Sequence, residues 1–185
     1  MQNDTVQTND TPAEAGRPVA SRTLEMHSFE KRPGLLVTEG ELRDDRHIDF
    51  NGFSETKISA GRFHTIRARL EVDTASMQIE SIQVEFQDVP HSECRELHQL
   101  YQQLVGLNIE SGFTRAVLQR VGGPKACAHL THLIITMGPA IVQAAFTYQT
   151  RAETSNVPTR KQVQDYFIDS CYVWRADGKY ARLHG

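Results

Sequence analysis

The sequence has few cysteines, and their arrangement does not suit an extracellular disulfide scaffold. Its three cysteines, Cys94, Cys127 and Cys171, are odd in number and widely spaced along 185 residues. Disulfide frameworks of small secreted proteins use even numbers of cysteines at characteristic spacings. We therefore expect free thiols and a reducing, cytoplasmic compartment.

The chain also lacks an excess of positive charge and an unbroken apolar segment. Because its formal net charge is −3, a nucleic acid is not an expected partner. Polar residues such as His132 and Gln143 interrupt the longest apolar stretch, residues 130–146, which predicts a buried helix rather than a membrane span. Residues 1–21 lack the basic start and apolar run of a secretory signal.

Several catalytic signatures are missing as well. The chain has no P-loop, no G-x-G-x-x-G after a strand and no G-x-S-x-G, so nucleotide binding and serine-hydrolase chemistry have no support. Paired C-x-x-C motifs and H-E-x-x-H are absent too, and no common zinc motif is present. Isolated cysteines and histidines are therefore the candidates for chemistry.

The composition predicts one domain behind a polar tail. Residues 1–25 are rich in Asn, Asp, Thr, Gln and Pro and carry few large apolar side chains, so they are predicted to be disordered. Residues 26–185 number roughly 160, which is enough for a single hydrophobic core. Both a monomer and a homo-oligomer are compatible with the sequence.

The first half of this domain has the pattern of β-strands. Residues 35–37 predict a strand that runs into a charged turn at residues 39–42. Residues 63–72 and 77–86 predict a hairpin with a turn at residues 73–76. In its second strand the apolar residues shift from odd to even positions, which predicts a β-bulge near Glu80.

The second half has the pattern of helices. Ser92 is predicted to cap a helix that Gly106 ends, and a second helix is expected over residues 112–121. Gly122-Gly123-Pro124 then precedes a third helix, residues 125–147. On a helical wheel its core face carries Leu130, Ile134, Met137 and Ile141, while His132 faces solvent.

The last residues predict a short helix and a hairpin. The helix is expected over residues 158–167, and the hairpin has strands around residues 172–174 and Tyr180 with a turn at Asp177-Gly178. Strands followed by helices are typical of an α+β domain. We expect an antiparallel sheet with three to four helices packed on it and a closing C-terminal hairpin.

Cys127 and His129 begin the third predicted helix. As about the fourth helical residue, counted from Pro124, Cys127 would lie near the positive end of the helix dipole, which favours a thiolate nucleophile. The alternative is a buried Cys that acts as a small hydrophobe. His129 lies at the edge of the core face, either as an acid or base near neutral pH or as a hydrogen-bonded boundary residue. The wheel places Cys127 and His129 on opposite edges.

Two further groupings are open to a functional or a structural reading. His64 lies in the predicted hairpin with Arg67 and Arg69 close by in sequence, a group that could bind an anion or form the polar face of a sheet. Glu39, Asp44 and Arg46 are open in the same way, since each could be solvated or form the wall of a cleft. A zinc site is the alternative to a protein without a cofactor. Its ligands would be soft or borderline: Cys94, Cys127, His129 and Cys171.

A set of short segments carries a family resemblance. The most specific is Cys127-Ala-His129-Leu-Thr131, and the others are Met26-His27, residues 34–39, His64, Arg69-Leu70, residues 104–107, residues 112–115 and residues 169–172. Together they resemble, over about residues 26–183, a bacterial family named domain of unknown function 2889. In that family the run usually reads Gly-Cys-Thr-His-Leu-Thr-Glu, where this chain has Ala126, Ala128 and His132 in place of Gly, Thr and Glu.

The resemblance places Cys94, Cys127, His129, Asp169 and Cys171, as well as His64, on family motif positions. It implies an association with the bacterial catabolism of plant-derived aromatics, where cofactor-free lyases release a hydroxymethyl group as formaldehyde. His129 or His64 would then be the base, and Arg67 or Arg69 would stabilise a developing phenolate.

Three functional hypotheses follow from the sequence. The first is a cofactor-independent lyase that acts on a small lignin-type phenolic substrate. The second is a non-catalytic protein that binds a metal or small ligand through the Cys and His residues, and the third is thioester hydrolysis through Cys127. The first two differ in their need for zinc.

Overall fold

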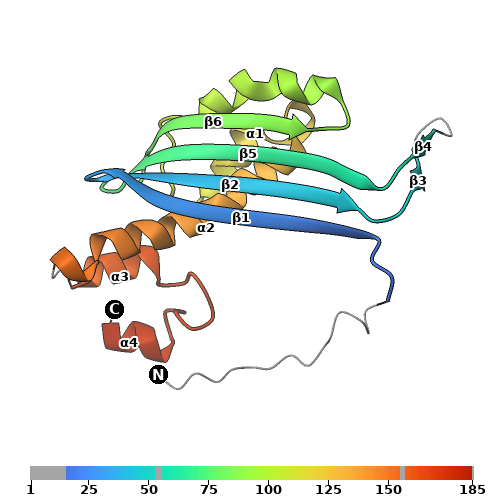
Figure 1. Cartoon of the computed structure of the whole chain (residues 1–185). Coiled ribbons are helices and arrows are strands. Elements are labelled where there is room, and N and C mark those ends of the chain that lie inside the picture. The colour runs from blue at the N-terminus through green and yellow to red at the C-terminus, as the bar shows by residue number, and fades with distance from the viewer. Residues whose placement is uncertain (1–15, 53–55, 155–156, 185) are drawn as a thin grey trace.

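The computed structural model describes residues 16–52, 56–154 and 157–184 and has an α+β fold, as predicted. Its four long strands form an antiparallel sheet in the order β1-β2-β5-β6 (Figure 1). These strands are β1 (Ala20–Arg32), β2 (Leu35–Arg46), β5 (Gly61–Asp73) and β6 (Ile79–Asp88). A two-stranded ribbon of β3 (Phe50–Asn51) and β4 (Lys57–Ile58) extends from one end of this sheet.

The first strand was not predicted. Residues 20–25, assigned to a disordered tail, form the start of β1, while the tail residues 1–15 lie outside the described part of the chain. Because β1 is an edge strand and largely exposed, its sequence is polar and lacks the apolar alternation that identifies a strand. The predicted charged turn at residues 39–42 is also wrong, since β2 continues through it to Arg46.

The predicted hairpin is confirmed as β5 and β6. The pairing register changes between Glu71 opposite Ser81 and Val72 opposite Ile79, so Glu80 is the extra residue of a bulge. This is the position at which the apolar pattern changes phase in the sequence. The bulge keeps the side chains of Ile79 and Ile82 buried on the same side of the sheet.

Three of the predicted helical segments are present with changed details. Residues Ser92–Leu104 (η2) form a 3-10 helix; its N-cap is His91 rather than Ser92, and no side chain caps it. Helix α1 (Phe113–Val121) matches the prediction. A short 3-10 turn, η3 (Gly123–Lys125), delays the long helix α2 to Ala128–Gln149, which makes Cys127 its N-cap residue rather than a residue inside the helix.

The C-terminal segment is helical. After the short turn η4 (Ala152–Thr154), helix α3 (Arg160–Tyr166) begins with a capping box in which Thr159 and Gln162 exchange hydrogen bonds. Residues 171–178 form bends and turns, and α4 (Lys179–His184) is a helix, so the predicted closing hairpin is wrong. Phe167 contacts Phe146 of α2 edge to face and also contacts Trp174, and these contacts hold the C-terminal segment against the end of α2.

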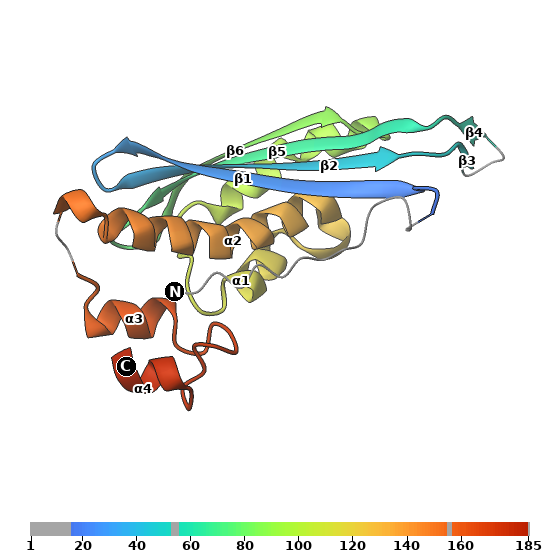
Figure 2. The ribbon, with the colours of Figure 1, turned by 60° about the horizontal axis from the view of Figure 1, so that its bottom comes forward.

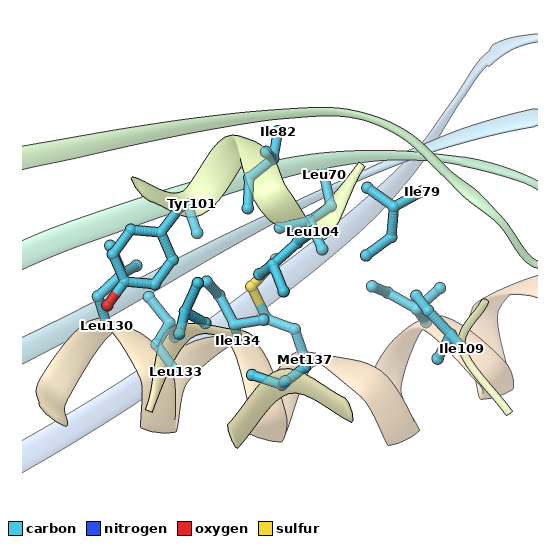
Figure 3. Packing of buried hydrophobic residues seen from close by; sticks show 14 of the residues in the cluster. Leu70, Ile79, Ile82, Tyr101, Leu104, Ile109, Leu130, Leu133, Ile134 and Met137 are labelled. Carbon is cyan, nitrogen blue, oxygen red and sulfur yellow. The ribbon is translucent and has the colours of Figure 1, made fainter. Parts of the chain in front are cut away.

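The core lies between the sheet and the layer of α2, α1 and η2, and Figure 2 shows α2 running beneath the sheet with α3 and α4 on its far side. Each fully buried Leu or Ile stabilises such a core by about 1.5–3 kcal/mol. The predicted core face of α2 is confirmed, since Leu130, Ile134, Met137 and Ile141 are fully buried. They meet side chains of β5, β6 and η2, including Leu70, Ile82, Tyr101 and Leu104 (Figure 3).

Gly40 lets α2 approach β2 closely. A Cβ atom at this position would lie 2.7 Å from Sδ of Met137 and 3.2 Å from a methyl of Leu133. Such contacts are shorter than van der Waals packing allows, so only glycine fits without movement of the helix side chains. This close approach sets the distance between the helix and the sheet.

By length and composition alone, helix α2 could cross a bilayer, because its most apolar 18 residues have a mean hydropathy of 1.4. The expectation that polar residues make this segment unable to span a membrane is therefore wrong by the criterion of length and composition. Its buried face packs against the sheet and α1, and His132 is exposed as predicted. In this fold α2 is the central core helix.

Candidate functional site

The polar site lies at the end of the sheet from which β3 and β4 extend (Figure 1). Side chains alternate between the two faces of a strand, and Leu42 of β2 faces the core. Asp44 is therefore on the same inner face, and it is only 1% exposed. Arg22 of β1 is paired with it on one side, and His64 of β5 on the other.

A second bulge brings His64 to this position. His64 is opposite Asp44 and Arg62 is opposite Asp45, so Phe63 is the extra residue on β5. His64 consequently continues the inner row formed by Ile66 and Ala68, and it is only 6% exposed.

Asp44 is held as an anion by Arg22. The guanidinium Nε and Nη2 atoms donate to Oδ1 and Oδ2 at 2.7 and 2.8 Å, a bidentate pair. These hydrogen bonds lower the pKa of Asp44 below its usual 3.8, against the opposing effect of burial. The carboxylate can therefore only accept hydrogen bonds at neutral pH.

The carboxylate of Asp44 fixes the tautomer of His64. Its Nδ1 lies 3.0 Å from Oδ2 of Asp44 and must be the donor. Burial lowers the pKa of His64, so the ring is neutral near pH 7 and its Nε2 carries a lone pair. Nε2 of His64 has no hydrogen-bond partner among the described residues. Every fully buried polar side-chain atom of those residues does have a partner, so Nε2 is not fully buried and reaches solvent.

His129 comes to the same point from the first turn of α2. Its ring centroid lies 4.0 Å from that of His64, and its Nε2 lies 3.7 Å from Oδ2 of Asp44. Burial, followed by the nearby His64, lowers the pKa of His129, although 32% of its side chain is exposed. Two neutral imidazoles therefore face each other beside one carboxylate, and His129 is the more accessible.

A buried hydrogen-bond network fixes the start of α2. The hydroxyl of Tyr101 lies 3.0 Å from both the carbonyl of Cys127 and Oγ1 of Thr131, and it accepts the N–H of Cys127 at 3.2 Å. Thr131 in turn donates to the carbonyl of Val121. Burial raises the pKa of Tyr101 to about 12, so the hydroxyl stays protonated and orients the turn that carries His129.

Cys127 is closer to His129 than the helical wheel predicts. Its Sγ lies 4.0 Å from Nδ1 of His129, and the residue is 7% exposed. The wheel failed because it assumed helical geometry for Cys127, which has the extended backbone of an N-cap. The thiol thus contacts the imidazole from the side opposite Asp44.

The predicted placement of Arg67 and Arg69 beside His64 is wrong. They are at odd positions, whereas His64 continues the even-numbered inner row, so they lie on the outer face of the sheet. There Arg67 pairs with Glu41 and Arg69 with Glu39. A hollow of about 310 Å³ on this outer face is lined by both arginines together with Glu39, Ala68, Gln83, Val84 and Glu85.

Arg46, Phe63 and Phe50 form a series of contacts that leads to His64. Arg46 follows Asp44 by two positions on β2, so it shares the inner face, and its guanidinium lies 5.3 Å from the ring centroid of Phe63. Phe63 contacts His64 edge to face at 5.1 Å. Phe50 of β3 contacts Phe63 in the same way at 5.7 Å.

Of the four predicted zinc ligands, His129 belongs to a close group of potential ligands in the described part of the chain, together with Asp44 and His64, which were not predicted as ligands. The potential ligand atoms of these three residues lie within 4.8 Å of one another. Cys94 is partly buried near Cys127, with its pKa raised by burial and then by that neighbour. Cys171 is exposed in the turn after α3, where backbone hydrogen bonds lower its pKa.

Sequence reasoning left Asp44 and Arg46 ambiguous and missed Arg22, which it placed in the tail. A usable signal was present for Asp44. It follows Leu42 at the inner phase of a strand, and a charged residue at such a position is buried only if it is paired. No comparable signal marks Arg22, because an edge strand tolerates arginine anywhere.

The arrangement has the parts of an acid/base site. A buried carboxylate orients one imidazole, a second imidazole is accessible, and both have pKa values below the ordinary 6.5. The same three side chains are also of a type that binds divalent metals, although Arg22 occupies both oxygens of Asp44.

The comparisons with known proteins give one match. No curated protein and no solved structure matches the chain. The family model described as "Protein of unknown function (DUF2889)" matches residues 20–143. The matched range is shorter than the expected residues 26–183 at its C-terminal end, so it contains Asp44, His64, Cys127 and His129 but neither Asp169 nor Cys171. The chain belongs to the DUF2889 family.

Proposed function

We propose that the protein is a cofactor-independent lyase that releases formaldehyde from a small phenolic aromatic compound of the lignin type. The observation that carries the proposal is the contact of two neutral histidines, His64 and His129, beside the buried Asp44. Retro-aldol cleavage needs a base that is unprotonated at neutral pH, and both imidazoles have lowered pKa values. The aromatic substrate is the expectation that the family resemblance gave.

His129 is the base in this proposal. It is the more exposed of the two rings and can meet a substrate hydroxyl directly. When it takes up a proton, the imidazolium lies 3.7 Å from the carboxylate of Asp44, which stabilises the charge. His64, oriented by Asp44, offers Nε2 as a second acceptor to the bound substrate.

The reaction balances without an external oxidant or reductant. His129 removes the proton of a primary hydroxyl, and the O–H electrons form the carbonyl of formaldehyde. The adjacent carbon–carbon bond breaks, and its electrons form a carbon–carbon double bond as a neighbouring aryl-ether C–O bond breaks. The leaving phenolate then takes the proton from His129, which restores the neutral imidazole.

Formaldehyde release from a phenolic compound with a primary hydroxymethyl group tests the proposal, provided that its aryl ether is on the carbon next to the one that loses this group. The informative variants are His129→Gln and His64→Asn, because Asn keeps a donor near the Nδ1 position toward Asp44 while it removes Nε2. General acid–base catalysis contributes about 100- to 10,000-fold, so each variant should lose activity on that scale. His132→Gln, on the exposed side of the same helix, is the matched control and should stay active.

The proposal fails if the wild-type protein releases no formaldehyde from such substrates, or if His129→Gln releases it at the wild-type rate. Circular dichroism melting curves of each variant separate lost chemistry from lost folding. The expected location is the cytoplasm, where the free Cys127 beside His129 would stay reduced.

A second candidate function is divalent metal binding, which the closeness of Asp44, His64 and His129 favours. Binding would require Arg22 to release at least one oxygen of Asp44. Metal analysis of protein purified without chelator separates the two functions. About one zinc per chain, lost in Asp44→Asn and needed for activity, would replace the cofactor-independent mechanism.

A further inference from the structure

Arg46 is a cation at the end of the sheet that carries Asp44 and His64, and no carboxylate in the described part of the chain neutralises it. Three neighbouring cations have partners: Arg22 pairs with Asp44, Arg62 with Asp45, and Lys57 with Asp49. Arg46 forms no ion pair within residues 16–52, 56–154 and 157–184, although it is half-buried. A half-buried guanidinium without an anion has unused hydrogen-bond donors.

The position of Arg46 relates it to the histidine pair. It lies on the inner face of β2, one inner position beyond Asp44. Burial is the main reason why the pKa values of His64 and His129 are lowered, and the charge of Arg46 lowers both a little further, as a cation near both rings does. A ligand that contacts His129 is therefore also within the field of Arg46.

The side chains next to Arg46 are aromatic. Phe63 lies under the guanidinium, and its ring makes edge-to-face contacts with both His64 and Phe50. Small-molecule sites combine such apolar surfaces with a few polar groups that fix orientation. An unpaired guanidinium beside aromatic rings suits a ligand that is itself aromatic and negatively charged.

We propose that Arg46 binds the anionic group of an aromatic ligand, a phenolate or a carboxylate, while the ring of that ligand packs against Phe63. This deepens the proposed lyase function, on which it rests, by naming the residue that selects the substrate. In the lyase reaction Arg46 would stabilise the departing phenolate. Arg46 takes the role of phenolate stabiliser that the family resemblance implied for Arg67 or Arg69, which lie on the outer face of the sheet.

Binding of simple probes tests this assignment without turnover. Benzoate and benzamide have nearly the same shape, but only benzoate carries a negative charge. In the second pair, 4-nitrophenolate carries a charged phenolic oxygen that nitrobenzene lacks. We expect wild-type protein, titrated by NMR or calorimetry at pH 8, to prefer the anion of at least one pair. A charge-assisted hydrogen bond corresponds to a preference of about ten- to hundredfold. The pair that shows the preference identifies the anionic group.

Two variants and one control decide the role of Arg46. Arg46→Gln should abolish the preference for the anion, and Arg46→Lys, which keeps the charge without the planar fork, should retain part of it. Arg43→Gln is the control, because Arg43 is on the same strand but pairs with Glu25 and Glu41 on the outer face. The expectation for this control is an unchanged preference.

The inference is overturned if wild-type protein does not distinguish the anion from its neutral analogue in either pair, if it binds none of the probes, or if Arg46→Gln keeps the preference. Failure of the lyase function has a different signature. A protein that releases no formaldehyde but prefers an anionic probe through Arg46 would retain the binding site and lose only the reaction.

Discussion

Nδ1 of His64 and Oδ2 of Asp44 lie 3.0 Å apart on the neighbouring strands β5 and β2, both of them buried. Because the carboxylate is already held by Arg22, this hydrogen bond gives the ring one tautomer and one orientation. His129 then stacks on a ring whose position is fixed. The site therefore depends on strand pairing more than on any single helix.

Asp44→Asn should weaken both stability and activity. The amide cannot accept two charge-assisted hydrogen bonds from Arg22 and one from His64, so we expect a loss of about 1–3 kcal/mol in the free energy of unfolding. Activity should fall about tenfold or more, since His64 loses its fixed tautomer. Urea unfolding and formaldehyde release measure the two effects.

Asp45→Asn is the matched control for this change. Asp45 is the adjacent residue, and its ion pair with Arg62 is partly exposed. Exposed pairs contribute about 0–1 kcal/mol, so stability should change little and activity not at all. Equal effects of the two variants would contradict the role given to Asp44.

Stability should fall as the pH drops below 6.5. His64 and His129 have folded-state pKa values lowered by burial, so the unfolded chain binds protons first as the pH falls through the ordinary value of 6.5. The contribution of these two histidines to the free energy of unfolding is complete above pH 6.5 and is lost as the pH falls toward their folded-state pKa values. Asp44, whose pKa is also lowered, adds a further loss below pH 3.8.

Urea midpoints measured between pH 8 and pH 5 test this dependence, and His64→Asn should flatten it because one of the two titrating rings is gone. A midpoint that rises on acidification over this range would show that the histidines are charged in the folded protein. The pH profile of formaldehyde release should have its acid limb below pH 6.5 for the same reason.

Tyr101→Phe should destabilise the protein by about 1–3 kcal/mol. The change removes a buried hydroxyl that accepts the N–H of Cys127 and also contacts the Cys127 carbonyl and the side chain of Thr131, so the Cys127 N–H loses the partner that the structure gives it. Tyr172→Phe, at an exposed position, is the control and should be neutral. Unfolding by urea gives both values, and comparable losses would argue against the network.

Gly40→Val should cost about 1–3 kcal/mol through overpacking against α2. Met137 is the first side chain that the new atoms meet. Combining Gly40→Val with Met137→Ala should therefore be less destabilising than the sum of the single changes, as a double-mutant cycle would show. Strict additivity would mean that the two positions do not touch.

Local patterns were enough to predict the elements whose residues repeat regularly. The β5–β6 hairpin, the bulge at Glu80, helix α1 and the buried face of α2 all follow from alternation or helical periodicity in the sequence. The α+β class follows from their order. Edge strand β1 was not predicted because it has little apolar pattern. Helix α4 was not predicted because Tyr180, like Tyr172 and Trp174 before it, is an aromatic residue that also suits a strand.

His64 and His129 could be identified as candidates from the sequence, because few residue types titrate near neutral pH. That they touch, that Asp44 joins them, and that Arg67 and Arg69 do not, is seen only in the folded chain. These relationships depend on one-residue bulges and on the pairing of strands distant in the chain. A shift of one residue exchanges the two faces of a strand, so a local pattern cannot fix which side chains meet.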